Sequence, residues 1–166
     1  LELSSEAESL KAFALWSMGS LNGVTIEQLP MIFLVFILGG VASLFIVNPL
    51  NLLVLGEEEC RLMGYNVKRL RLMIVFITAL FTGLITAFCG PIAFIGLAIP
   101  NLTRILFKTQ DHKLLLFANL LFGALFLLSC DILIQLLSAW ILIPINALTS
   151  LIGAPFVIYI LIRKIR

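Results

Sequence analysis

Residues 30–48 read PMIFLVFILGGVASLFIVN and contain no charged side chain. The hydrocarbon core of a bilayer is about 30 Å thick, and about 20 helical residues cross it. The run comes close to that length, and it lacks the polar alternation of a membrane-barrel strand. It therefore predicts a transmembrane helix. The helix is expected to begin near Pro30, because proline is tolerated in a first helical turn, and to stop at Asn48-Pro49.

The composition of the whole chain agrees with a membrane setting. Of its 166 residues, 61% are hydrophobic and 12% are charged, and the mean hydropathy is +1.16. A soluble domain has about half apolar and about a quarter charged residues, and one of this size buries only about two-thirds of its surface. Lipid must cover the rest, so we expect an all-α, polytopic transmembrane bundle. The net charge of +2 says little about partners, but the sequence shows no broad basic face, so we expect no nucleic-acid partner.

Further apolar runs predict that the whole chain, 1–166, is one transmembrane region with cytoplasmic connections. Apart from Lys11, its lysines and arginines gather in three groups, which the positive-inside rule assigns to the cytoplasm. The predicted segments are a partial helix 6–18, a cytoplasmic loop 56–71, and spans at about 30–48, 72–90, 92–107, 114–138 and 145–162.

The hairpin between Leu72 and Thr103 is too short for two full spans. We expect one limb, near Gly90-Pro91, to be short or broken. Broken helices at membrane depth are tolerated where they line a cavity or are buried in protein, which points to a translocation path. A shallow interfacial hairpin without a transport role is the alternative.

No catalytic constellation is visible in the sequence. His112 is the only histidine, and it lies in a basic loop. The cysteines lack metal-ligand spacing, and no glycine-rich phosphate loop ends in Gly-Lys-Ser or Gly-Lys-Thr. We therefore predict no enzyme activity and no cofactor or metal. Any ATP hydrolysis would belong to another chain.

Asp131 is an acid inside a long apolar run, and Gln135 lies one helical turn beyond it. An ionisable residue at such a position is costly and marks a functional site by default. A proton site of an ion-coupled transporter is one interpretation. A structural hydrogen bond, or a position near the membrane interface, is the other.

The polar stretch 56–71 begins with Gly56-Glu57-Glu58-Glu59-Cys60-Arg61-Leu62-Met63-Gly64. This pattern predicts a short amphipathic helix, because its three acids fall in the first turn, where the helix dipole favours negative charge. Gly64 is suited to a left-handed cap after the helix end. Such a helix could lie on a membrane surface, dock in a groove of a cytoplasmic partner, or be a solvated connector.

Six motifs, in order along the chain, resemble those of the FecCD-type permeases of ABC importers, which carry ferric siderophores, haem or vitamin B12. Each motif alone is weak, but the ordered set is specific. They are Trp16–Leu21 (W-x-x-G-S-L), Leu50–Glu58 (L-N-x-L-x-L-G-E-E), Gly90–Leu97 (G-P-I-G-F-V-G-L), Ile99–Arg104 (V-P-H-x-x-R), Asp111–Lys113 (D-H-R) and Thr149–Phe156 (T-x-L-I-G-A-P-F).

The resemblance implies the C-terminal half of a ten-helix, multi-pass permease of the bacterial inner membrane. It implies a second permease subunit as a homodimer, a cytoplasmic ABC ATPase and a periplasmic or lipoprotein substrate-binding protein as partners, within a lipid bilayer. The residues that we assign with this resemblance are Gly56, Glu57, Glu58, Arg61 and Gly64 for coupling to the ATPase; Gly90, Pro91, Phe94, Gly96, Pro100, Asn101, Gly153 and Pro155 for the translocation path; Ser5 and Glu6 for a gate; and Asp131 and Gln135 for either contact with the binding protein or an intramembrane polar role.

The sequence also departs from that family's pattern. Gln135 stands where an arginine is often found and Leu142 where a glutamate is, which puts the binding-protein contact in question. Asn101, Asn146 and Phe117 replace a histidine, a glycine and a proline. By this resemblance, we expect the chain to cover only the family's C-terminal half. A non-transporting membrane remnant or structural subunit is therefore one alternative, and an ion-coupled transporter using Asp131 is another.

Overall fold

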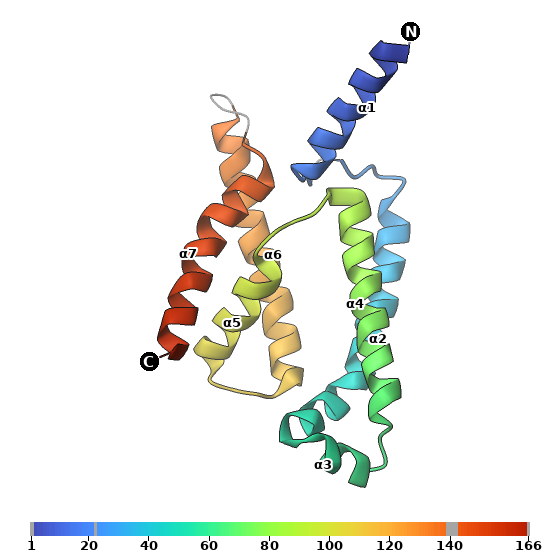
Figure 1. Cartoon of the computed structure of the whole chain (residues 1–166), viewed down its shortest axis with the longest axis vertical. Helices are drawn as coiled ribbons and strands as arrows, with labels where there is room; N and C mark the ends of the chain where they lie inside the picture. The colour runs from blue at the N-terminus through green and yellow to red at the C-terminus, as the bar shows by residue number, and fades with distance from the viewer. Residues whose placement is uncertain (1, 22, 139–142, 166) are drawn as a thin grey trace. The chain divides into compact units, whose positions relative to one another are not determined.

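The computed structural model describes the backbone of residues 2–21, 23–138 and 143–165, and the side chains of these residues except 2–7, 15, 159–161 and 163–165. Within that part the chain forms α-helices and no strand, so the predicted all-α class is confirmed (Figure 1). The helices are α1 Glu2–Ser17, α2 Leu29–Leu55, α3 Glu57–Leu62, α4 Val67–Cys89, α5 Ile95–Phe107, α6 His112–Leu137 and α7 Ile145–Ile165.

Three helices in the described part are long and apolar enough to cross a membrane. They are α2 with 27 residues, α4 with 23 and α6 with 26. At 1.5 Å per residue each exceeds the roughly 30 Å hydrocarbon core. Many of their large apolar side chains are exposed, among them Phe45, Phe76 and Leu136. Such a surface needs lipid or further protein to cover it, as the sequence predicts.

The prediction that the first long helix stops at Asn48-Pro49 is wrong, because α2 runs on to Leu55 with Pro49 buried inside it. Proline removes one backbone donor and crowds the carbonyl four residues earlier. Leaving the helix would free more backbone groups where water is scarce, so membrane helices tolerate proline. The helix α4 also begins earlier than expected, at Val67 rather than Leu72.

The expected short limb of the central hairpin is confirmed. Helix α5 has 13 residues, which gives a length of about 20 Å and leaves it shorter than a bilayer core. It follows the break at Gly90 and begins after Phe94, whose φ is +66°. A positive φ is uncommon for a residue with a side chain, so the turn into α5 is held by its surroundings.

The chain divides into two compact units. The first unit consists of residues 1–24, 85–101 and 122–166, and the second of residues 25–84 and 102–121. The second unit therefore contains the predicted cytoplasmic loop 56–71.

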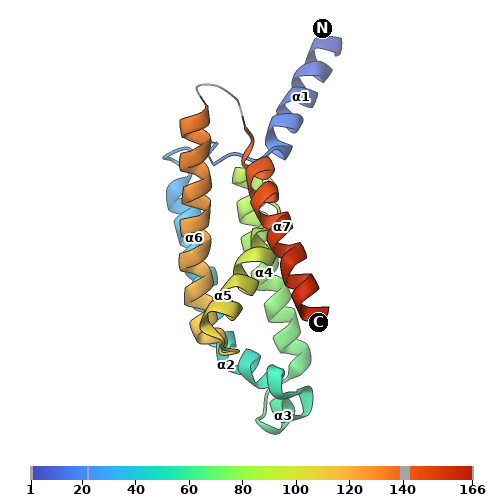
Figure 2. The same ribbon diagram turned by 90° about the vertical axis from the view of Figure 1, so that its left-hand side faces the viewer.

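In the second unit, α3 packs against the ends of α2 and α4. Cys60 of α3 is fully buried, in one cluster with Ile46 of α2 and Val67 of α4. Both views show α3 beyond the joined ends of the two long helices (Figures 1 and 2). Further along, a Cβ atom on Gly39 would lie 2.6 Å from the Phe81 ring, so the missing side chain lets α2 and α4 approach.

Candidate functional site

The cap that ends α3 is built by Gly64, whose φ is +85°. The Gly64 N–H donates to the Arg61 carbonyl at 2.9 Å, and the Tyr65 N–H donates to the Cys60 carbonyl at 3.1 Å. These two bonds form the Schellman motif, which satisfies carbonyls that the helix end leaves unpaired. The short helix and its glycine cap, predicted from the sequence, are confirmed.

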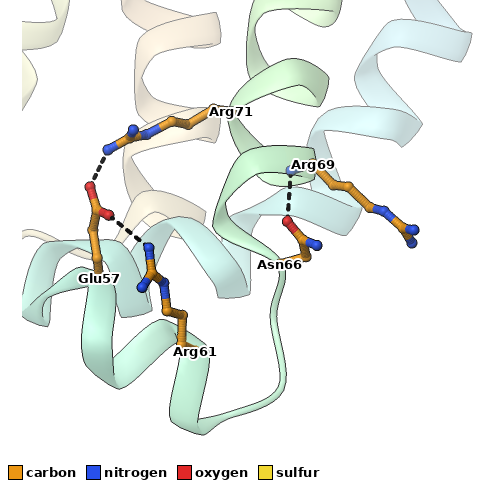
Figure 3. A network of polar contacts seen from close by, with 5 residues as sticks. All are labelled: Glu57, Arg61, Asn66, Arg69 and Arg71. Atoms are coloured by element: carbon orange, nitrogen blue, oxygen red, sulfur yellow. Dashed lines mark hydrogen bonds and ion pairs between the residues drawn. The ribbon is translucent and has the colours of Figure 1, made fainter.

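Glu57 at the start of α3 lies between two arginines (Figure 3). Its Oε2 atom is 3.7 Å from Nη2 of Arg61, one turn further on, and its Oε1 atom accepts a hydrogen bond from Arg71 of α4. At the start of α4, the Asn66 Oδ1 atom accepts the backbone N–H of Arg69 at 3.1 Å, which caps that helix. Since Glu57 and both of its partners are exposed, each pair contributes about 0.2–1 kcal/mol. The Arg61 pair lies within α3, and the Arg71 pair joins α3 to α4.

The outer surface of α3 is unusual for a solvated loop. Leu62 is 82% exposed and Met63 is 66% exposed, next to the exposed acids Glu58 and Glu59. Beside them, a hollow of about 580 Å³ is lined by Arg61 and residues 64–68. Exposed large apolar side chains with charges around them are suited to docking on another surface, and a solvated connector does not need them.

In the first unit, two of the sequence motifs meet at a tight backbone crossing. Gly90 has a φ of +76°, and a Cβ atom on it would overlap the Trp16 carbonyl oxygen. The Trp16 Nε1–H donates to the Thr86 carbonyl at 3.1 Å, and the Ser20 N–H donates to the Cys89 carbonyl at 2.9 Å. A Cβ atom on Gly19 would lie 3.4 Å from the Pro91 carbonyl oxygen. The end of α1 is thus fixed to the end of α4.

Phe94 packs against α7, because a Cβ atom on Gly153 would lie 2.5 Å from the Phe94 Cβ. Next to it, the Asn146 Oδ1 atom accepts the Ala93 N–H at 2.8 Å, and the Asn146 N–H donates to the Met18 carbonyl at 3.4 Å. Asn146 therefore ties the entry of α5 and the end of α1 to the start of α7. In the sequence, Asn146 is only a departure from a family pattern, and nothing in its local sequence marks this role.

The other predicted path residues lie along α5 and α7. Gly96 and Pro155 are exposed, and Pro100 is half-buried. The Asn101 Nδ2–H donates to the Leu97 carbonyl at 2.8 Å, within its own helix. The structure thus joins Gly90 and Pro91 to the Trp16–Gly19 turn and Phe94 to Gly153. The proposed gate residues, Ser5 and Glu6, belong to α1, but their side chains lie outside the described part of the chain.

Asp131 and Gln135 face each other on α6, where the Gln135 Nε2–H donates to Oδ2 of Asp131 at 2.7 Å. Both line a cavity of about 460 Å³ in the first unit, whose other walls include residues 18–21 and 143–145. The walls are mainly apolar, with one carboxylate beside an amide. Such a cavity suits a group that donates hydrogen bonds or carries positive charge.

Comparison with known proteins shows what these features belong to. Residues 1–163 match the model of the FecCD transport family. The chain belongs to this family. The predicted resemblance is confirmed, and FecCD membership explains the order of the six motifs from Trp16 to Phe156.

Three of the relatives to which the chain is similar are named as transport permeases. The hemin transport system permease HmuU of Yersinia pestis is 36% identical over 96% of this chain and 48% of its own length. The vitamin B12 import permease BtuC of Klebsiella pneumoniae is 38% identical over 93% of this chain and 46% of its own length. The iron(3+)-hydroxamate import permease FhuB of Bacillus subtilis is 32% identical over 91% of this chain and 39% of its own length. The chain spans about half the length of the curated relatives it matches, or less.

Proposed function

We propose that this chain is the C-terminal half of the permease subunit of an ATP-driven importer, which carries an iron–siderophore complex, haem or a corrinoid through the bacterial inner membrane. FecCD membership and similarity to permeases named for hemin, vitamin B12 and iron-hydroxamate support this proposal. The long apolar helices α2, α4 and α6 support the membrane location. ATP is hydrolysed by a partner chain, and the permease itself is not an enzyme.

The observation that carries the proposal is the coupling helix, by which we mean α3 with its cap at Gly64. It presents Leu62 and Met63 outward, while Cys60 fixes it to the long helices from within. A short helix with an exposed apolar face suits a groove on a partner protein. The partner we propose is a cytoplasmic ABC ATPase, contacted by Gly56, Glu57, Glu58, Arg61 and Gly64.

In this mechanism ATP binding and hydrolysis move the ATPase, the coupling helix moves with it, and the substrate path opens alternately to each side. We assign the path to Gly90, Pro91, Phe94, Gly96, Pro100, Asn101, Gly153 and Pro155, with a gate at Ser5 and Glu6. A second copy of the permease would complete the path as a homodimer. A periplasmic or lipoprotein substrate-binding protein would deliver the substrate near Asp131 and Gln135, where the 460 Å³ cavity lies.

The test is co-purification of the full-length protein that contains this chain. We expect an ATPase subunit and a substrate-binding protein to come with it, and the latter to retain haem, a corrinoid or a ferric siderophore, identified by mass spectrometry and absorbance. Loss of the ATPase on replacing both Leu62 and Met63 with serine would place the contact at the coupling helix. A matched control is the double replacement of Leu120 and Leu121, which are exposed on α6.

The outcome also separates the two alternatives. Uptake that persists without an ATPase and collapses with the proton gradient would favour an ion-coupled transporter using Asp131. A protein that binds neither partner and carries no substrate would favour a membrane remnant or structural subunit. Either result overturns the proposal.

A further inference from the structure

Asn51 lies on α2, little more than one turn before the helix ends at the coupling helix. Its side chain contacts the loop between α5 and α6 with both of its polar atoms. The Asn51 Nδ2–H donates to Oδ1 of Asp111 at 2.8 Å, and the Asn51 Oδ1 accepts the His112 backbone N–H at 2.8 Å. Nδ1 of the His112 ring is also 2.7 Å from this oxygen. Since the oxygen is an acceptor, that nitrogen carries the proton.

Asp111 is held in place independently of Asn51. Its Oδ1 accepts the Lys113 N–H at 3.0 Å, and its carbonyl accepts the Leu115 N–H at 3.0 Å, so it caps the start of α6. Its own N–H donates to the Thr109 Oγ1 at 3.1 Å. Asn51 therefore binds an ordered turn, and the turn forms the first part of α6.

Beyond this turn, helix α6 is also joined to α5. Thr103 of α5 is fully buried, and its hydroxyl donates a hydrogen bond to Oδ1 of Asn119 in α6 at 2.5 Å. The segments 102–107 and 112–121 are thus connected by the loop and by this hydrogen bond, within the second unit. We call these connected segments the α5–α6 hairpin.

At its other end Asn51 is continuous with the coupling helix. The Gly56 N–H donates to the Leu52 carbonyl, and the Cys60 N–H donates to the Gly56 carbonyl, each at 3.3 Å. Cys60 is fully buried against α2 and α4. A displacement of α3 must therefore move the end of α2, and Asn51 with it.

We propose that Asn51 is a positioning residue that transmits displacement of the coupling helix to the α5–α6 hairpin, and so to the short helix of the substrate path. The inference rests on the proposed function, since it needs the ATPase to act at α3. The inference states that a single side chain, that of Asn51, passes the displacement from α2 to Asp111 and His112. A structural role for Asn51 would predict a loss of stability without a selective loss of this transmission.

The experiment is hydrogen–deuterium exchange of the full-length permease in complex with its ATPase in nanodiscs, with and without ATPγS. In the unaltered protein we expect nucleotide to change the exchange of both the coupling segment 56–65 and the hairpin segment 104–113. In Asn51→Ala we expect the change at 56–65 to remain and the change at 104–113 to be lost.

A second pair of variants guards against simple misfolding. Asn51→Asp places two carboxylates side by side and should lose the response at 104–113. Adding Asp111→Asn to it restores one donor and one acceptor in reversed order, and Asn still caps α6, so the response should return. The inference is overturned if Asn51→Ala keeps the response at 104–113, or loses it at both segments, or if the double variant fails to restore it. If the unaltered complex shows no response at 56–65, the proposed function fails instead.

Discussion

The carbonyl oxygen of Trp16 occupies the position that a Cβ atom on Gly90 would need. Gly90 also has a φ of +76°, which side chains other than glycine rarely adopt. Two independent reasons therefore require glycine at this crossing between the end of α1 and the end of α4.

Gly90→Ala should destabilise the protein strongly. The left-handed backbone alone costs about 1–2 kcal/mol, and the overlap with a backbone carbonyl adds to it because backbone cannot rotate away. Thermal unfolding of the full-length protein in detergent measures the effect. Gly123→Ala is the matched control, since a Cβ atom there has open space and alanine favours a helix. Equal melting temperatures for the two variants would contradict the tight crossing.

Gly64→Val should uncouple ATP hydrolysis from uptake. Its φ of +85° is left-handed, while a Cβ atom on it meets nothing within 4 Å, so the effect comes from the backbone of the cap alone. We expect uptake per ATP hydrolysed to fall, measured in proteoliposomes with the ATPase and binding protein. Gly64→Asn is the control, because asparagine tolerates this conformation. The proposed role of the cap is wrong if Gly64→Val leaves uptake per ATP hydrolysed unchanged.

Glu57→Gln should loosen the coupling helix more than Glu58→Gln does. Glu57 makes ion pairs with Arg61 and Arg71, worth about 0.2–1 kcal/mol each because they are exposed. Limited proteolysis within 56–66 at low ionic strength should be faster for Glu57→Gln. The difference should shrink in high salt, which screens exposed charges. A difference that is the same at both salt concentrations would mean that the pairs do not hold α3.

Gly153→Ala should disturb the packing of Phe94 against α7, since the new Cβ atom would lie 2.5 Å from the Phe94 Cβ. We expect a lower melting temperature for Gly153→Ala. Phe94→Gly removes the clashing atom and relieves a φ of +66°, so the stability changes of the two substitutions should not add in the double variant. Additive effects of the two substitutions would show that these residues do not compete for the same space.

The pKa of the Asp111 carboxyl should lie below its ordinary value of 3.8. The Lys113 backbone N–H, followed by the Asn51 amide, holds the pKa of Asp111 down by donating to its ionised form. Its contribution to stability is therefore complete above that value and is lost as the pH falls through the lower pKa of the folded state. In Asn51→Ala the Asp111 pKa should rise, as measured by carboxyl ¹³C NMR titration. An unchanged pKa would mean that the Asn51–Asp111 hydrogen bond is not formed in the membrane-embedded protein.

Much of the helical layout could be read from local sequence. Helix α3, its acidic first turn and its cap at Gly64 follow from residues close together in the chain. The short limb α5 follows from counting residues between charged groups. The end of α2 could not be predicted in this way, because the effect of Pro49 depends on the solvent around the helix. A buried proline in a membrane helix does not act as a stop signal.

The sequence by itself determined that this chain is a membrane protein, which helices it forms and which family it belongs to. These properties depend on hydropathy, on spacing and on the order of motifs, which are all local or one-dimensional. Only the tertiary structure decided which distant residues meet: Gly90 with Trp16, Phe94 with Gly153, and Asn51 with Asp111. Such contacts depend on how close two backbones come and on which polar groups remain to be paired. No single segment contains that information, because a hydrogen bond or a close approach is a property of both of its partners.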